Sequence, residues 1–314
     1  MSTIEEMRSE IERIDRRIVS LLDRRMAACS AIGDLKAAAG AGVEDREREA
    51  ALLEMLSGSG MAHLTRRELE EIYASVFRCS RMRQSCAPRS GPRLCVTVLE
   101  TDLQTLLRRG EEASSDGHVV EFRLDALERI ELDSMLPWRV GPCVVTNRKA
   151  DEGGFFKGGE RERLEYLEAA LDYEPSYIDL EWRSPPALRS RILGAAGNTR
   201  TILSFHETRY TPPLKDLLTL WEEMAESGAD VLKVVTLAKR FEDCLTILRF
   251  LAETGRQGPE VIGHCMGEFG KASRVLAPLF GSFLAYAAPE GGMKGAEGQL
   301  SAGEMMRAWD VFGL

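Results

Sequence analysis

Eight short apolar runs after residue 93 limit most strongly the folds open to this chain. They lie at residues 94–99, 118–124, 142–147, 176–182, 200–206, 230–236, 260–266 and 282–288, and helical patterns separate most of them. Eight strand-then-helix units in about 220 residues predict a (β/α)8 TIM barrel, with functional sites at the carboxyl ends of its strands. A doubly wound open sheet is the alternative, but no G-x-G-x-x-G motif follows the first run.

The first 85 residues show helical periodicity alone. One heptad position holds Ile4, Ile11, Ile18 and Ile32, and the other holds Met7, Ile14, Leu21, Ala28 and Leu35. This pattern predicts an amphipathic helix of about ten turns that ends at Gly40 and Gly42. Two further helices are expected near 45–55 and 65–84. A segment rich in proline, glycine and serine at 85–93 indicates a linker between a helical domain, 1–88, and a barrel domain, 93–314.

The composition narrows the class of partner and the compartment. The net charge is -9, so bulk attraction to nucleic acid or to an anionic membrane is not expected. Any anionic substrate must therefore meet local clusters of arginine and lysine. Seven scattered cysteines without a C-x-x-C pair indicate reduced thiols. The sequence shows no signal peptide or membrane span, so we expect a cytoplasmic protein.

Charged side chains converge on the predicted carboxyl ends of five strands. They are Glu121, Arg123 and Asp125 on the second run, Arg148 and Glu152 after the third, His206 at the end of the fifth, Lys233 within the sixth and Arg274 after the seventh. Each has a structural reading, as an ion pair, a satisfied core histidine or a snorkelling lysine. Burying an ammonium in a strand is costly unless it is paired or neutralised. The convergence at one rim favours a site.

These residue types suggest one reaction. A desolvated lysine loses much of its preference for the charged form, and a neutral amine can form a Schiff base with a ketone. His206 could then remove the proton made acidic by the imine and later protonate a leaving hydroxyl. Arg274 could hold a carboxylate. Together they describe dehydration of a keto acid with a β-hydroxyl.

Residues 93–314 resemble the type I 3-dehydroquinate dehydratases. The matching motifs are Glu121-Phe122-Arg123-Leu124-Asp125, Thr146-Asn147-Arg148 with Glu152-Gly153-Gly154, Ile178-Asp179-Leu180-Glu181, Ser204-Phe205-His206, Gly228-Ala229-Asp230 with Lys233, Met266-Gly267 with Ser273-Arg274, and Gly298-Gln299. The resemblance implies that Lys233 forms the imine, that His206 is the acid and base, and that Glu152 orients His206. It also implies substrate contacts from Glu121, Arg123, Arg148, Arg274 and Gln299, with no metal or cofactor.

The last barrel loop departs from the family. The family's usual Ser-Ala-Pro-Gly-Gln reads Gly295-Ala296-Glu297-Gly298-Gln299 here. A carboxylate beside an anionic substrate is unfavourable unless it points away. We therefore expect an effect on loop closure and substrate affinity more than on the chemistry.

Arg25 interrupts the isoleucine seam of the first helix and needs a partner. The structural alternatives are an interhelical bridge to Asp45 or Glu49, or a polar residue that sets the helix register. The functional alternative is an anionic ligand, with Arg8 and Lys36 on the same flank. Arg8 and Arg25 are ~25 Å apart along one straight helix, so a small ligand reaches both only if Arg8 comes from an antiparallel second chain.

Residues 1–85 resemble the all-helical (AroQ-class) chorismate mutases. The residues that match the family's site are Arg8, Arg25, Lys36, Asp45, Arg48, Glu49, Ser80 and Gln84. The resemblance implies an intertwined homodimer that converts chorismate to prephenate. Three arginines, Arg8, Arg25 and Arg48, would clamp the two carboxylates. Lys36 and Gln84 would stabilise charge on the ether oxygen, and Asp45 and Glu49 would bind the hydroxyl side.

The sequence thus predicts a bifunctional enzyme of the shikimate pathway. One alternative keeps an active dehydratase and gives the helical domain only a dimerisation or ligand-sensing role. A second makes the helical domain an isochorismate-pyruvate lyase, although Glu49 and Gln84 favour the mutase. A barrel that only binds a carboxylate leaves the lysine inside a strand without a reason.

Overall fold

The chain divides into two compact units, residues 1–90 and 91–314. The structure is a computed structural model, and it describes residues 4–38, 45–58, 60, 62–85, 92–138, 141–255 and 258–313. Gly40 and Gly42, the predicted end of the first helix, lie outside these residues. None of the described helices is both long enough and apolar enough to cross a membrane.

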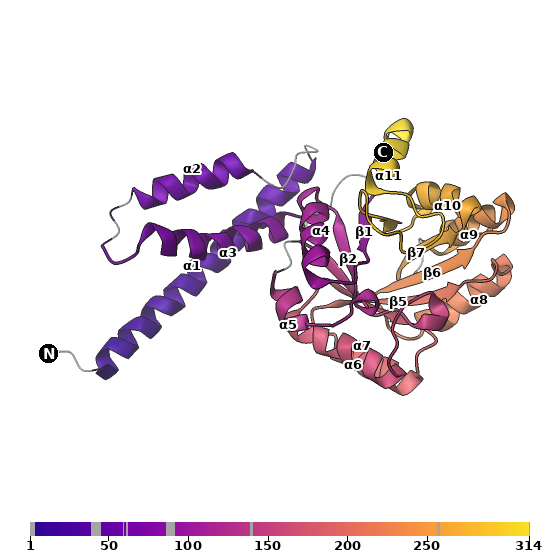
Figure 1. The fold of residues 1–314 in the computed structure, drawn as a ribbon, viewed down its shortest axis with the longest axis horizontal. Coiled ribbons are helices and arrows are strands. Elements are labelled where there is room, and N and C mark those ends of the chain that lie inside the picture. The colour runs from indigo at the N-terminus through magenta and orange to yellow at the C-terminus, as the bar shows by residue number, and fades with distance from the viewer. Residues whose placement is uncertain are drawn as a thin grey trace. The chain divides into compact units, whose positions relative to one another are not determined.

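The N-terminal unit consists of the three predicted helices (Figure 1). They are α1 (Ile4–Ala38), α2 (Arg46–Ser57) and α3 (Arg66–Ser85). Asp45 caps α2, because its carboxylate accepts a hydrogen bond from the backbone N–H of Arg48 at 2.9 Å. Helix α3 packs on α1 and α2.

Much of the α1 seam remains exposed within one chain, including Ile32 and Leu35 near its C-terminal end. Ile4 is 74% exposed and Ile11 is 57% exposed, and Met7, Ile14, Ile18 and Leu21 are each between 46% and 52% exposed. An apolar stripe of this length on an amphipathic helix is typical of a surface that another helix covers.

The C-terminal unit is a parallel eight-stranded (β/α)8 barrel, as predicted (Figure 1). Its strands are β1 (Leu94–Val98), β2 (Val119–Arg123), β3 (Cys143–Thr146), β4 (Tyr177–Glu181), β5 (Arg200–Glu207), β6 (Val231–Leu237), β7 (Glu260–Met266) and β8 (Ala285–Ala287). Strands pair in sequence order from β1 to β7, and β8 pairs with β1. Between β7 and β8, the Phe283 N–H donates to the Val261 carbonyl at 2.8 Å.

Helices follow the strands and cover the outside of the sheet. They are α4 (Leu103–Ser115), α5 (Leu132–Met135), α6 (Glu160–Ala170), α7 (Pro186–Ala195), α8 (Leu214–Ala225), α9 (Phe241–Thr254), α10 (Lys271–Leu276) and α11 (Ala302–Phe312). On β6, Val231 joins the apolar cluster inside the barrel, whereas Leu232 and Val234 pack in the outer core beneath the helices. This alternation puts Lys233 on the interior face.

Candidate active sites

A cavity of about 260 Å³ lies at the carboxyl ends of the barrel strands. All eight predicted dehydratase residues line it: Glu121, Arg123, Arg148, Glu152, His206, Lys233, Arg274 and Gln299. Thr97, Gly153, Val235, His264, Met266, Tyr286, Gly295 and Ala296 complete the lining. The barrel register thus brings together side chains that are up to 178 positions apart (299 − 121) in the sequence.

Lys233 is buried and ion-paired. Its Nζ atom lies 3.0 Å from an Asp179 carboxylate oxygen and 3.7 Å from a Glu121 carboxylate oxygen. The same Nζ atom sits 3.9 Å from the centre of the Tyr286 ring. The sequence analysis expected a desolvated lysine, and the structure adds two carboxylates, those of Asp179 and Glu121, beside its ammonium group. These ion pairs offset the free-energy cost of burying the ammonium group of Lys233.

His206 is held by Glu152 in an orientation suited to proton transfer. One Glu152 oxygen, Oε2, lies 3.1 Å from His206 Nδ1 and accepts the His206 backbone N–H at 3.0 Å. Burial raises the pKa of Glu152 to about 7. Burial, together with the Arg148 and Lys233 cations, keeps the pKa of His206 well below its ordinary value, so the imidazole is neutral at neutral pH.

The three arginines of the cavity differ in how far their donors are already used. Arg148 donates to Asp179, Glu181 and Ser204 at 2.8 to 3.1 Å. Arg123 makes a two-pronged contact with Asp125 at 2.7 and 2.8 Å.

Arg274, in contrast, is buried with Nε and one Nη group unpaired among the described residues. Burial without a carboxylate lowers the pKa of Arg274 to about 10. Unpaired buried donors of this kind are costly unless a ligand supplies the acceptor, so the cavity is suited to an anion at Arg274.

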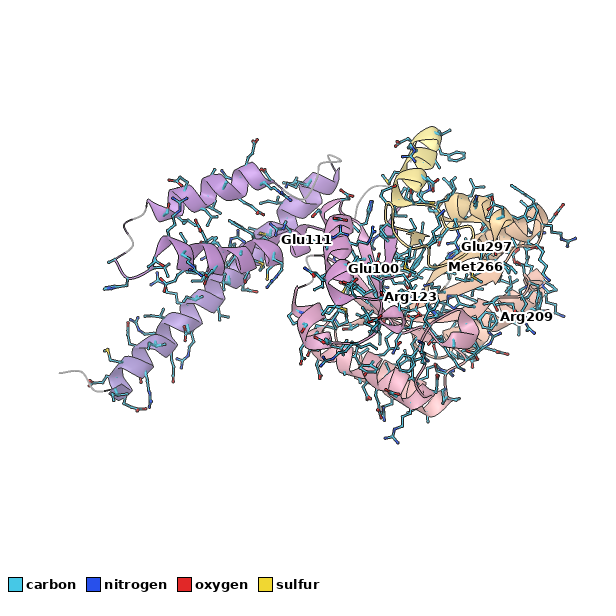
Figure 2. All side chains as sticks on the ribbon, in the orientation of Figure 1. Glu100, Glu111, Arg123, Arg209, Met266 and Glu297 are labelled. Carbon is cyan, nitrogen blue, oxygen red and sulfur yellow. The ribbon has the colours of Figure 1, made fainter. Side chains whose placement is uncertain are left out.

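The loop after β8 closes one side of the cavity. The Gln299 side-chain oxygen accepts the Gly295 N–H at 2.7 Å, and the Gly267 N–H at the end of β7 donates to the Glu297 carbonyl at 3.0 Å. Figure 2 labels Arg123, Met266 and Glu297, which come from β2, β7 and this loop. The Glu297 side chain is exposed, and the loop residues that line the cavity are Gly295, Ala296 and Gln299. The carboxylate therefore points away from the cavity.

A second cavity, of about 430 Å³, lies within the helical unit. It brings together six of the predicted mutase residues: Arg25, Lys36, Asp45, Arg48, Glu49 and Ser80. Arg8 is not among them; it is exposed near the start of α1, 3.8 Å from Glu5. The side chain of Gln84 lies outside the described part of the chain.

The contacts of Arg25 decide between its structural alternatives. Arg25 donates hydrogen bonds to Ser80 on α3 and to the Cys29 sulfur on α1, and it lies 6.0 Å from the centre of the Phe77 ring. Glu49 pairs with Arg81 at 2.7 Å. The interhelical bridge from Arg25 to Asp45 or Glu49 is therefore not present among the described contacts, and Arg25 lines the cavity.

Several residues of the two cavities carried no role in the sequence analysis. Asp179 joins Lys233, Arg148 and Ser204 through hydrogen bonds of 2.6 to 3.0 Å. Asp179 and Glu181 alternate with apolar residues on one strand, and two buried carboxylates on one face were a signal for a nearby cation. Arg81 and Tyr286 had no such signal, because an arginine on a helix and a tyrosine in an apolar strand are both common for structural reasons.

Comparison with known proteins agrees with this geometry. The family model described as type I 3-dehydroquinase matches residues 94–314. The chain belongs to the type I 3-dehydroquinase family. The 3-dehydroquinate dehydratase of Methanocaldococcus jannaschii is 29% identical over 226 residues, which cover 70% of this chain and 99% of the relative. That of Methanopyrus kandleri is 34% identical, with coverage of 70% and 100%.

A solved structure supports the fold of this type I 3-dehydroquinase. The 3-dehydroquinate dehydratase of Geobacillus kaustophilus superposes with a TM-score of 0.66, at 24% identity, over 72% of this chain and 92% of that chain. Residues 7–85 match the family model described as chorismate mutase type II. The predicted fusion of the two domains is confirmed, so the chain combines a lyase domain with an isomerase domain.

Proposed function

We propose that Lys233 of the barrel forms a Schiff base with 3-dehydroquinate and that the barrel dehydrates it to 3-dehydroshikimate. The observation that carries this proposal is one cavity lined by a buried lysine, a neutral histidine oriented by a carboxylate, and an arginine with unpaired donors. Those three features supply a nucleophile, a proton carrier and a carboxylate anchor.

The residues divide the reaction between them. Arg274 binds the substrate carboxylate, and Gln299, Arg123, Arg148 and Glu121 surround the ring and its hydroxyls. The Lys233 iminium acidifies the neighbouring carbon. His206 removes a proton there and returns it to the departing hydroxyl, which leaves as water. Glu152 accepts a hydrogen bond from the Nδ1–H group of His206, which leaves the other ring nitrogen of His206 as the base.

In the helical unit we propose the rearrangement of chorismate to prephenate. Arg25 and Arg48, with Arg8 from a second chain, clamp the two carboxylates in a near-attack geometry. Lys36 and Gln84 stabilise charge on the breaking ether oxygen, and Asp45 and Glu49 bind the hydroxyl side. Ser80 holds Arg25, and Arg81 holds Glu49, as their contacts indicate.

A homodimer through the helical domain accounts for the position of Arg8. Most of the exposed seam residues of α1 lie on the stretch of helix that carries Arg8, and ~25 Å of helix separates Arg8 from Arg25. A second, antiparallel α1 would cover the seam and bring an Arg8 to each cavity. The proposed domains are residues 1–88 and 93–314, and the proposed location is cytoplasmic.

The dehydratase proposal is tested by trapping the imine. Borohydride added during turnover of 3-dehydroquinate should inactivate the barrel and raise the mass of the chain by one bound ligand. Peptide mapping should place that mass on Lys233, and Lys233→Ala should show neither label nor dehydratase activity. Label on Lys239 or Lys271, or an active Lys233→Ala enzyme, would refute the assignment.

A further inference from the structure

Two histidines flank Lys233 at matching positions of the barrel. In the strand register, Val235 of β6 pairs with His206 on β5 and with His264 on β7. Lys233 lies two residues earlier on the same face of β6, so both histidines are its diagonal neighbours, one on each side. Both line the cavity and both are buried.

The two histidines differ in what holds them. His206 is fixed by Glu152, whereas no described residue hydrogen-bonds the ring of His264. The His264 ring lies 5.9 Å from the ring of Tyr286, the same ring on which the Lys233 ammonium rests. His264 therefore lies on the strand next to that of the reacting lysine, against the same Tyr286 ring, and no described residue holds its ring nitrogens.

Imine formation needs such a group. The lysine nitrogen bonds to the ketone carbon while the carbonyl π pair moves to oxygen; the C–O bond then breaks and the nitrogen lone pair forms the C=N bond. The balance is an ammonium and a ketone on one side and an iminium and water on the other. Two protons must therefore travel from nitrogen to oxygen, and a neighbouring base that accepts and returns them accelerates both transfers.

We propose that His264 is a second acid–base histidine of the dehydratase, which carries these two protons, while His206 serves the carbon proton and the leaving hydroxyl. The inference rests on the proposed imine at Lys233. Burial beside Arg274 and Lys233 keeps the pKa of His264 well below its ordinary value, so the ring is neutral and can accept a proton first. In the reverse direction His264 assists hydrolysis of the product imine.

The test measures the rate at which the imine forms. The full chain is mixed with 3-dehydroquinate and quenched with borohydride at successive times, and the label on Lys233 is quantified. His264→Gln should slow labelling by about 100-fold, within the usual range for general acid–base catalysis. His264→Ala should be equally slow and should recover with added imidazole. His206→Ala should label at the wild-type rate without turning over.

A matched control separates chemistry from packing. Ile262 lies two residues before His264 on β7 and faces the barrel interior, so Ile262→Val changes the packing without removing a proton carrier. The Ile262→Val chain should acquire the borohydride-trapped label on Lys233 at the wild-type rate. Wild-type labelling in His264→Gln, or labelling that depends on His206 alone, would overturn the role of His264 and leave the proposed function intact. No label at Lys233 in the wild-type chain would overturn both.

Discussion

At the scale of single residues, the dehydratase site is a set of buried charges that neutralise one another. Asp179 is the shared partner, because it accepts from Lys233, Arg148 and Ser204. Although burial alone would raise the pKa of Asp179, the Arg148 and Lys233 cations hold this pKa at about 2. Removing one partner of such a buried pair lowers the free energy of unfolding by about 3–5 kcal/mol, because the remaining charge is neither paired nor hydrated. The site is therefore preorganised by the same contacts that make it costly to alter.

Glu152 predicts how the barrel responds to pH. Burial raises its pKa from 4.5 to about 7 in the folded chain, so the folded state favours the protonated form. The stability from this group is complete below pH 4.5 and is lost as the pH rises through 7. Glu152→Gln cannot ionise. The free energy of unfolding of the wild type should therefore fall relative to Glu152→Gln between pH 4.5 and 8, by on the order of 3 kcal/mol.

Tryptophan fluorescence measures this effect for the barrel alone. All four tryptophans, at positions 138, 182, 221 and 309, lie in the C-terminal unit. Denaturant titrations of both proteins across this pH range give the two curves. Parallel curves would show that Glu152 does not carry the raised pKa.

At the scale of elements, the loop after β8 is where this chain departs from its family. Glu297 is exposed, yet its backbone ties the loop to β7. A Cβ atom at Gly295 would lie 3.3 Å from the Thr97 methyl group, 3.4 Å from the Gln299 side-chain oxygen and 3.6 Å from an Arg123 nitrogen, so a serine there requires a small shift of Thr97.

Glu297→Pro, alone or with Gly295→Ser, should lower the KM for 3-dehydroquinate. The proline ring stiffens the loop, and the change also removes an exposed negative charge from the rim above the cavity, which corresponds to about a 2- to 5-fold effect. Steady-state kinetics measure the KM, and Glu297→Gln, which removes the charge without adding a proline ring, separates the two effects. An unchanged or higher KM would mean that the present loop is already suited to closure.

The elements themselves were predictable from periodicity, and the partners of the charges were not. Eight apolar runs and an isoleucine seam predicted the strands and α1 to within a few residues, because apolar spacing reports which face is buried. The pairing of Lys233 with Asp179 spans 54 residues and depends on the register between β4, β5 and β6. Register fixes which rim residues meet, and no local pattern carries that information.

At the scale of the whole molecule, the mutase cavity of one chain lacks an arginine that the sequence assigns to it. Arg8 lies outside the cavity, on the part of α1 whose apolar seam is exposed. In the proposed homodimer, the helix that covers the seam would also complete the site.

Mixing two inactive variants tests this shared site. Arg8→Ala and Arg25→Ala chains should each lack mutase activity. After subunit exchange, one pocket of a mixed dimer holds both defects and the other holds neither, so an equal mixture should recover about a quarter of the wild-type activity. With exchange confirmed, an inactive mixture would argue for pockets built within one chain.

The dehydratase and mutase domains of this chain are proposed to work through two separate active sites. The most direct measurement assays both reactions, on the purified full-length chain and on two single variants. The wild type should dehydrate 3-dehydroquinate and rearrange chorismate. Lys233→Ala should lose the dehydratase and keep the mutase, and Arg25→Ala should do the reverse. A wild-type chain without mutase activity, or a variant that loses both activities while it remains folded, would contradict the account.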